Sequence, residues 1–217
     1  SHDFIKFAFL RHVARQTSLR IGLNWYLTDP LKVDPPGNKD GEKRHHLKED
    51  IWRAWDANLV AELEWFAAPS NRKLSNFYEK DILPDDTLYH DAIVPNLQRK
   101  DLEARNAWHK DAIHGLSDAD FIFLDPDNGL QVKSMTPKRS PKYALYSEVA
   151  EWASKGKVVT TIQFARQCDP VQKAIQVCAL FSEVAETAIL YPTIRARVAP
   201  NLLLITAGPK DKCDNVN

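Results

Sequence analysis

The chain has 217 residues, which is enough for one well-filled domain because domains commonly run ~100 to 200 residues. Hydrophobic residues make up 44% and charged residues 27% of the chain, a balance that argues against a disordered, collagen-like or coiled-coil protein. Lys and Arg together number 29, as do Asp and Glu. With a net charge of zero, the protein has no global positive field, so a polyanion would have to bind to a local basic patch.

Cysteine usage and hydropathy place the protein in a reducing, aqueous compartment. The cysteines Cys168, Cys178 and Cys213 form an odd set without C-x-x-C spacing, which argues against a disulfide framework and against a zinc knuckle. No apolar run approaches the ~18 residues of a membrane span. We therefore expect a cytoplasmic protein with no membrane partner.

The first half of the chain is mainly helical by pattern. Apolar residues recur every three or four positions, interrupted by one short apolar run and by a segment rich in Pro, Gly and charge. In chain order we expect a helix over 3–16, a buried strand over 19–27, an exposed loop over 31–46, and helices over 47–66, 71–94 and 97–116.

The second half alternates between strands and helices. We expect strands over 120–124, 158–164, 186–191 and 201–207, with helices over 143–154 and 170–183. Such alternation is typical of βαβ units on a mainly parallel sheet. The predicted fold is a single α/β domain over 1–217, three-layered and Rossmann-like. It has a mostly helical insertion at about 29–116 and an antiparallel C-terminal strand pair.

The carboxyl ends of the predicted strands are where a ligand is expected, because open α/β sheets bind ligands at that edge. Asn24 and Tyr26 follow the first strand, and the segment DPDNG, residues 125–129, follows the strand over 120–124. Gln163 and Arg166 stand at the end of the strand over 158–164. We expect residues 125–128 to line the main pocket beside Asn24 and Tyr26.

The DPDNG segment is the most informative motif. Pro126 fixes φ, and Asn128 with Gly129 tolerates positive φ, so the chain turns sharply while presenting Asp125 and Asp127 side by side. Two carboxylates at a strand end could orient a substrate amine or hold a divalent cation. A purely structural Asx-type turn is the alternative interpretation.

The order of elements, together with FIFLDPDN and with DFIKF at residues 3–7, resembles the class I S-adenosylmethionine-dependent methyltransferases. Within that class it is most similar to the ribosomal-RNA adenine-N6 methyltransferases. The resemblance implies that Asp125 accepts a hydrogen bond from the adenine amine and that Pro126 holds the turn. Asp127 and Asn128 stand where that family has a proline and a stacking aromatic, so Tyr26 or Tyr143 would have to stack on the base.

The same resemblance implies S-adenosylmethionine as the cofactor, with Asp3, Lys6, Asn24 and Tyr26 as its contacts. The glycine-containing loop that lets this cofactor approach the backbone is absent after the first strand, which ends in NWYL.

A second hypothesis is a metal-dependent nuclease in which Asp125 and Asp127 hold Mg²⁺. The lysines and arginines that follow, together with Tyr143, Gln163 and Arg166, could contact the phosphates and bases of DNA or RNA; the basic stretch comprises Lys133, Lys138, Arg139 and Lys142. A third hypothesis is a non-catalytic interaction module that has lost cofactor binding. The histidine pairs show no ligand spacing, so no histidine metal site is predicted.

Overall fold

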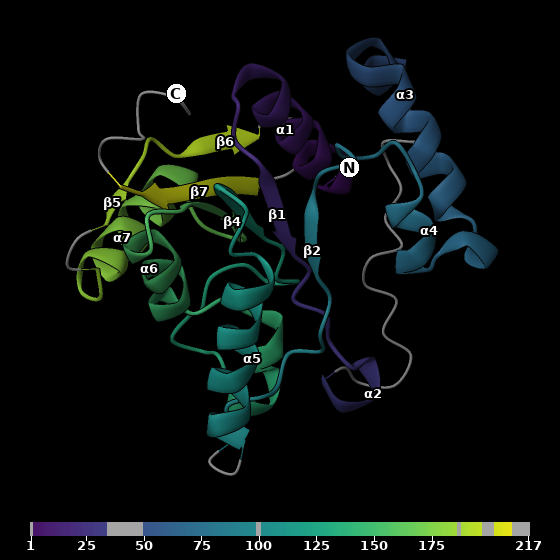
Figure 1. The fold of residues 1–217 in the computed structure, drawn as a ribbon. Helices are drawn as coiled ribbons and strands as arrows, with labels where there is room; N and C mark the ends of the chain where they lie inside the picture. Colours follow the sequence, from purple (N-terminus) through teal and green to yellow (C-terminus); the bar gives the residue numbers. More distant parts are fainter. Residues whose placement is uncertain (1, 34–49, 99–100, 186–187, 197–201, 210–217) are drawn as a thin grey trace. The chain divides into compact units, whose positions relative to one another are not determined.

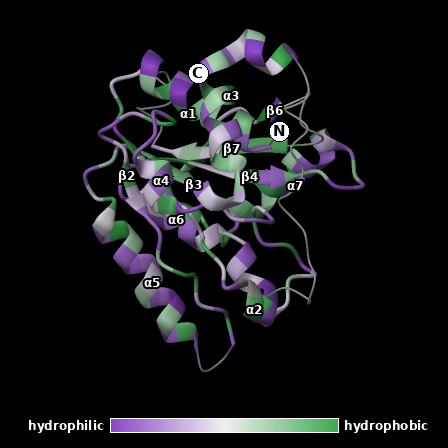
Figure 2. Ribbon diagram, turned by 90° about the vertical axis from the view of Figure 1, so that its right-hand side faces the viewer, coloured by the Kyte–Doolittle hydropathy of each residue, from purple (hydrophilic) through white to green (hydrophobic). Residues whose placement is uncertain are grey.

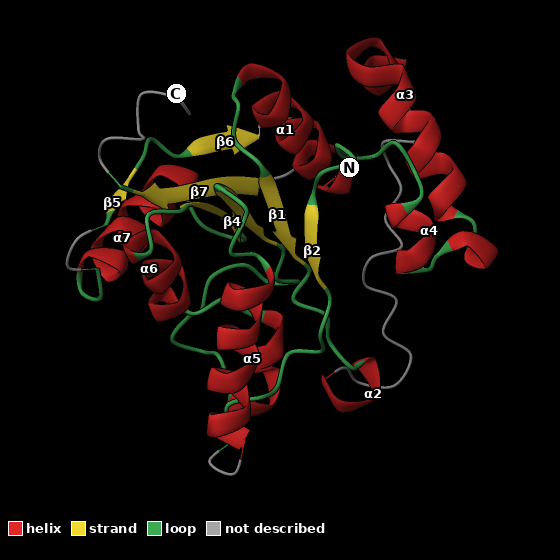
Figure 3. Ribbon diagram, viewed as in Figure 1, coloured by secondary structure: helices red, strands yellow, loops and turns green. Residues whose placement is uncertain are grey.

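A computed structural model describes residues 2–33, 50–98, 101–185, 188–196 and 202–209. It divides the chain into two compact units, which we describe separately (Figures 1 and 3). The first unit comprises Ser1–Ser18 and Gly37–Thr87, and the second comprises Leu19–Pro36 and Leu88–Asn217.

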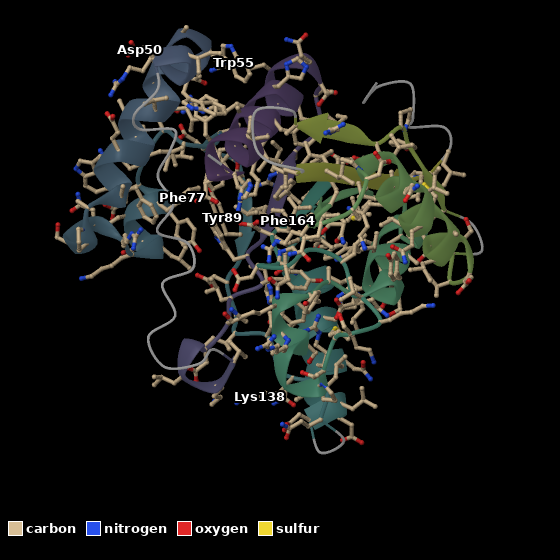
Figure 4. All side chains as sticks on the ribbon, turned by 180° about the vertical axis from the view of Figure 1, so that it is seen from behind. Asp50, Trp55, Phe77, Tyr89, Lys138 and Phe164 are labelled. Atoms are coloured by element: carbon tan, nitrogen blue, oxygen red, sulfur yellow. The ribbon has the colours of Figure 1, made fainter. Side chains whose placement is uncertain are left out.

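The first unit is a helical assembly with an aromatic core. Its elements are α1 (His2–Gln16), α3 (Asp50–Ala67), the 3₁₀ helix η2 (Pro69–Asn71) and α4 (Leu74–Tyr78). Phe4 of α1 meets Trp52 of α3 with ring centroids 5.0 Å apart, and Phe7 meets Phe77 of α4 at 5.1 Å. Phe77 lies on the inner side of α4 in Figure 4. Edge and tilted ring contacts of this kind add to the burial of apolar area.

Arg11 organises the polar part of the first unit. Its Nη1 lies 2.9 Å from Oδ2 of Asp56, and its Nη2 donates to Oδ1 of Asn58 at 2.8 Å. Its Nε donates to the carbonyl oxygen of Ile82 at 2.7 Å. Asp56 has extended backbone angles inside α3, with φ at −154°, and its Oδ1 accepts from the N–H of Leu59 at 2.9 Å. The kink in α3 therefore coincides with an Asp that caps the following turn.

The second unit contains a seven-stranded mixed sheet. Its strands are β1 (Ile21–Asn24), β2 (Leu88–His90), β3 (Phe121–Leu124), β4 (Val158–Phe164), β5 (Ile189–Leu190), β6 (Ile194–Ala196) and β7 (Leu202–Gly208). The order is β2-β1-β3-β4-β7-β5, and β6 also pairs with β7. Strands β2, β1, β3 and β4 are parallel neighbours, whereas β7 is antiparallel to β4, β5 and β6. Every strand except β7 thus points the same way.

Three helices pack on one face of this sheet: α5 (Leu102–Gly115), α6 (Tyr146–Ser154) and α7 (Pro170–Ser182). Their buried side chains form one cluster with Ile122 and Leu124 of β3, including Trp108, Trp152 and Phe181. Hydrophilic and hydrophobic segments alternate along α5 in Figure 2, as an amphipathic helix requires. The short helices α2 (Pro30–Val33) and η4 (Pro137–Lys142) follow β1 and β3.

The structure confirms most predicted elements and the α/β class with its antiparallel C-terminal strand. The prediction of a helical stretch over 71–94 is wrong in part, because only α4 is helical there and Leu88–His90 forms β2 beside β1. A strand of three residues at the end of a sheet carries too short a pattern to be recognised. The expected insertion contributes α3 and α4 to the first unit and α2, β2 and α5 to the second.

The short strand β6 was also missed, because the sequence predicted only a connection between 186–191 and 201–207. Most of the predicted loop over 31–46 lies outside the described residues, and its start forms α2. No helix in the described part of the chain is long and apolar enough to cross a membrane.

Gly129 is a position where the backbone itself needs glycine. Its φ is +87°, and an added Cβ would lie 2.5 Å from Oε1 of Gln163 and 2.8 Å from the carbonyl oxygen of Ile162. We expect Gly129→Ala to lower the free energy of unfolding by about 2 kcal/mol, from left-handed strain and the clash. Gly115 has ordinary φ and open space around it, so Gly115→Ala is the matched control. Urea unfolding of both variants tests this, and equal stabilities would contradict it.

Candidate functional site

The DPDNG turn lies where β1 and β3 end together. The N–H of Asp125 donates to the carbonyl oxygen of Asn24 at 3.0 Å, which ties the turn to the neighbouring strand. Asp125 is partly exposed, Pro126 is buried and Asp127 is exposed. The N–H of Asn128 donates to the carbonyl oxygen of Lys142 at 2.9 Å. The turn is therefore fixed on both sides and presents its carboxylates at the carboxyl edge of the sheet.

Asp127 has a cationic neighbour. Its Oδ2 lies 3.6 Å from Nζ of Lys142, a lysine whose side chain is only 10% exposed. The other basic residues of this stretch, Lys133, Lys138 and Arg139, are exposed. Lys142 thus contacts the turn, whereas the side chains of the other three basic residues lie on the surface.

Gln163 and Arg166 lie at the end of β4 in different environments. Gln163 is buried, and its Oε1 accepts from the N–H of Leu130 at 2.7 Å, which fixes the segment after the turn. Arg166 is exposed and stacks 4.8 Å above the ring centroid of Phe164, which is labelled in Figure 4. Tyr143 is half-buried. Of these three side chains, Arg166 has the most surface to offer a ligand.

Asn24 and Tyr26 face inward. Asn24 is 0% and Tyr26 is 2% exposed. Oδ1 of Asn24 lies 3.2 Å from Nδ1 of His90, and the ring of Tyr26 packs edge-on against Trp108 at 4.9 Å. Nδ2 of Asn24 is buried without a hydrogen-bond partner among the described residues. Neither side chain has surface that a bound ligand could contact.

Asp3 and Lys6 belong to α1 in the first unit. Nζ of Lys6 lies 2.7 Å from Oδ1 of Asp3, and the lysine charge is the main cause that lowers the pKa of Asp3 to about 2. These two residues form an intrahelical ion pair at i and i+3.

Tyr26, Arg105 and Glu148 form a buried polar cluster that the sequence did not reveal. Nε of Arg105 donates to Oε1 of Glu148 at 2.6 Å, and Nη2 donates to Oε2 at 2.9 Å. The hydroxyl of Tyr26 donates to the same Oε2 at 2.8 Å. Arg105 is 1% and Glu148 is 4% exposed. A bidentate pair with a third donor is the geometry that compensates the desolvation of both charges.

The cluster connects segments far apart in the sequence. Nη1 of Arg105 donates to the carbonyl oxygen of Pro95 at 3.3 Å, and Nη2 to that of Tyr143 at 3.0 Å. Oε2 of Glu148 also accepts from the N–H of Leu145 at 3.0 Å, which makes half of a capping box at the start of α6. One feature of the sequence could have indicated this cluster. Arg105 lies on the same face of α5 as Trp108 and Ala112, so a charged residue stands among the buried positions of the helix.

The pKa shifts follow from this burial. Burial above all, and then the charge of Glu148, raises the pKa of the Tyr26 phenol well above its usual range. Burial lowers the pKa of Arg105, but the charge and hydrogen bonds of Glu148 outweigh it and leave a raised pKa. Tyr26 is therefore neutral and Arg105 charged at physiological pH, so the hydroxyl donates to the carboxylate.

The second unit also contains a cavity of about 580 Å³. Its walls come from α2 with the preceding Asp29, from the segment after β2, and from η4. Asn24, Tyr26 and residues 125–128 are not among the lining residues. The residues predicted at the main pocket therefore do not line this cavity, and Asn24 and Tyr26 are buried in the core.

Among the described residues no group of three or more His, Cys, Asp or Glu side chains could hold a metal ion. Glu148, a potential third carboxylate beside Asp125 and Asp127, is engaged with Arg105 and Tyr26. His45 and His46 lie outside the described residues.

Comparison with models of known protein families, with curated proteins and with solved structures finds no match. The function must therefore be argued from the fold and from the geometry of the second unit.

The buried pair gives a stability prediction. We expect Glu148→Gln to lower the free energy of unfolding by about 3 kcal/mol or more, because it leaves the charge of Arg105 buried and uncompensated. Glu151→Gln, three residues later on α6, is the matched control; Glu151 is 43% exposed, and its loss should cost less than about 1 kcal/mol. Chemical unfolding measures the free energy of unfolding of both variants. Similar losses of stability in the two would show that the buried pair contributes no more than a surface pair.

Two histidines of the second unit predict a pH dependence. Burial lowers the pKa of His90 despite Asp111 and Asp91, and it lowers that of His109 despite Glu148 and Glu151, with Arg105 adding to the shift. As the pH falls, these histidines therefore bind protons in the unfolded chain near pH 6.5, and in the folded protein only at a lower pH.

We therefore expect the free energy of unfolding to fall as the pH drops from about 7.5 to 5.5. Urea unfolding at several pH values measures this slope. His109→Gln, which cannot titrate, should have a smaller slope; an unchanged slope in this variant would contradict the assignment to His109.

Proposed function

We propose that this protein is an enzyme of methyltransferase-like fold that acts on nucleic acid, with adenine-N6 methyl transfer as its reaction. The observation that carries the proposal is the position of Asp125. It stands at the shared carboxyl edge of β1 and β3, its backbone is fixed to Asn24, and its side chain is partly exposed. A sheet in which β7 alone is reversed supports the same fold assignment.

In this proposal Asp125 accepts a hydrogen bond from the exocyclic amine of an adenine and orients its nitrogen for attack. Pro126 and the hydrogen bond from Asn128 to Lys142 hold the carboxylate in place without a contribution from the substrate. The exposed Lys133, Arg139 and Arg166 would contact phosphates of DNA or RNA, which position a strand without reading its sequence.

S-adenosylmethionine would supply the methyl group, but the residues first assigned to it do not fit as contacts. Asn24 and Tyr26 have no exposed surface, and Asp3 pairs with Lys6 in the first unit. The role derived for Asp125 concerns the amine alone and does not depend on where the cofactor binds.

The nuclease hypothesis has weaker support than methyl transfer. A single Mg²⁺ at the turn would have to displace Lys142 from Asp127 and would have only two protein carboxylates, Asp125 and Asp127, as ligands. If neither methyl transfer nor nuclease activity is found, the hypothesis of a non-catalytic interaction module is favoured.

Two substitutions at the turn test the reaction. We expect Asp125→Ala to reduce methylation of adenine-containing RNA or DNA by at least about 100-fold, the usual contribution of an orienting general-base-type group. Asp127→Asn, at the exposed position, should retain most of the activity, and EDTA should have no effect. The measurement is transfer of a labelled methyl group, with circular dichroism as a check of folding.

Full methylation by folded Asp125→Ala would contradict the role of this carboxylate. Cleavage of the nucleic acid that is lost on chelation and in Asp127→Asn would replace methyl transfer by the nuclease hypothesis. A wild-type protein without either activity would favour the interaction module.

A further inference from the structure

The cavity of about 580 Å³ is built from three segments that follow the carboxyl ends of β1, β2 and β3. Asp29, Lys32 and Val33 come from the first, residues 93–96, Gln98 and Asp101 from the second, and Lys138 and Pro141 from the third. The volume falls within the ~300 to 1,000 Å³ of typical ligand sites, and this edge is where α/β sheets bind ligands.

Hydrogen bonds fix the walls to one another. The N–H of Leu97 donates to Oγ of Ser140 at 2.8 Å, which joins the second wall to η4. The N–H of Val94 donates to the carbonyl oxygen of Leu27 at 2.8 Å, which joins the same wall to the segment after β1. Arg105 adds bonds to the carbonyl oxygens of Pro95 and Tyr143. The cavity is therefore largely preformed, which lowers the entropic cost of binding.

The lining combines three kinds of surface. Val33, Val94 and Pro141 are buried apolar side chains, and Ile93 remains 58% exposed at the cavity. Asn96 and Gln98 contribute amide groups that can both donate and accept. The apolar and amide surfaces together suit a flat heterocycle with a polar edge.

The two lysines of the lining differ in whether they form an ion pair. Lys32 lies 3.3 Å from Asp29, a pair in which Lys32 is 77% exposed. Lys138 is exposed, is labelled near α2 in Figure 4, and has no carboxylate partner among the described residues. An ammonium group in such a position is a ready ligand for phosphate.

We propose that this cavity binds a nucleoside phosphate, with the base against the apolar and amide walls and the phosphate at Lys138. An apolar ligand would make no use of the ammonium group of Lys138. Inorganic phosphate alone would leave most of the volume and the apolar walls unused. The ligand is either a free nucleotide or one nucleotide of a single strand, since both present the same chemistry.

The cavity and the DPDNG turn share η4. Pro141 lines the cavity, and the next residue, Lys142, pairs with Asp127 and accepts from the N–H of Asn128. A nucleotide in the cavity would therefore lie beside the element that supports the turn. The proposal concerns binding alone and stands or falls independently of methyl transfer.

Calorimetric titration of the whole chain with AMP and with adenosine tests the proposal. We expect the wild type to bind AMP at least about tenfold more tightly than adenosine, the ratio that one charge-assisted phosphate contact provides. Lys138→Glu should abolish this preference while leaving adenosine binding unchanged. Ile93→Ala should weaken both ligands several-fold, because it removes apolar wall shared by both.

Lys173→Glu is the matched control, since Lys173 is partly exposed on α7, away from the cavity lining, and its Nζ donates to Oε1 of Gln176. It should bind AMP like the wild type. Displacement of AMP by a short adenine oligonucleotide would assign the cavity to a strand, and failure to displace it would assign a free nucleotide. Equal affinities for AMP and adenosine, no binding of either at millimolar concentration, or an unchanged preference in Lys138→Glu would overturn the proposal.

Discussion

The ion pair between Arg105 and Glu148 is the interaction on which the arrangement of the second unit depends. Moving two charges out of water costs several kcal/mol, and only close, complete pairing repays it. Here all three guanidinium nitrogens of Arg105 donate, to both carboxylate oxygens and to two carbonyl oxygens, and Glu148 also accepts from Tyr26 and from the start of α6. The pair therefore joins α5, α6 and the segments that follow β1, β2 and β3.

Both candidate sites take their geometry from these connections. The bond from Arg105 to Pro95 holds one wall of the cavity, and the bond to Tyr143 fixes the chain just after η4. From there Lys142 supports the DPDNG turn through Asp127 and Asn128. Loss of the buried pair would thus disturb the cavity and the turn together, although neither contains Arg105 or Glu148.

The sequence predicted the elements that depend on neighbouring residues, and it missed the contacts between residues far apart in the chain. Strands β3 and β4 are continuous apolar runs, and the DPDNG turn is encoded within five residues, so local pattern was sufficient for them. Strand β2 has three residues, and its pairing with β1 joins positions far apart in the chain, as Gly22 with Leu88. The cluster is similar: Tyr26 and Glu148 are 122 residues apart. No local spacing can reveal such a contact, and Asn24 and Tyr26 were assigned to a ligand because their burial could not be seen.

Tyr26 explains why a ligand would bind farther out than the resemblance to methyltransferases implies. The backbone after β1 adopts a left-handed conformation there, with φ at 51°, as a glycine would, and a tyrosine in this region costs roughly 1 to 3 kcal/mol. The hydrogen bond to Glu148 and the packing against Trp108 offset that strain. The side chain then fills the space that a glycine would leave open. The first position after β1 that lines the cavity of about 580 Å³ is Asp29, so a ligand bound in this cavity would meet α2 and η4, not the end of the strand.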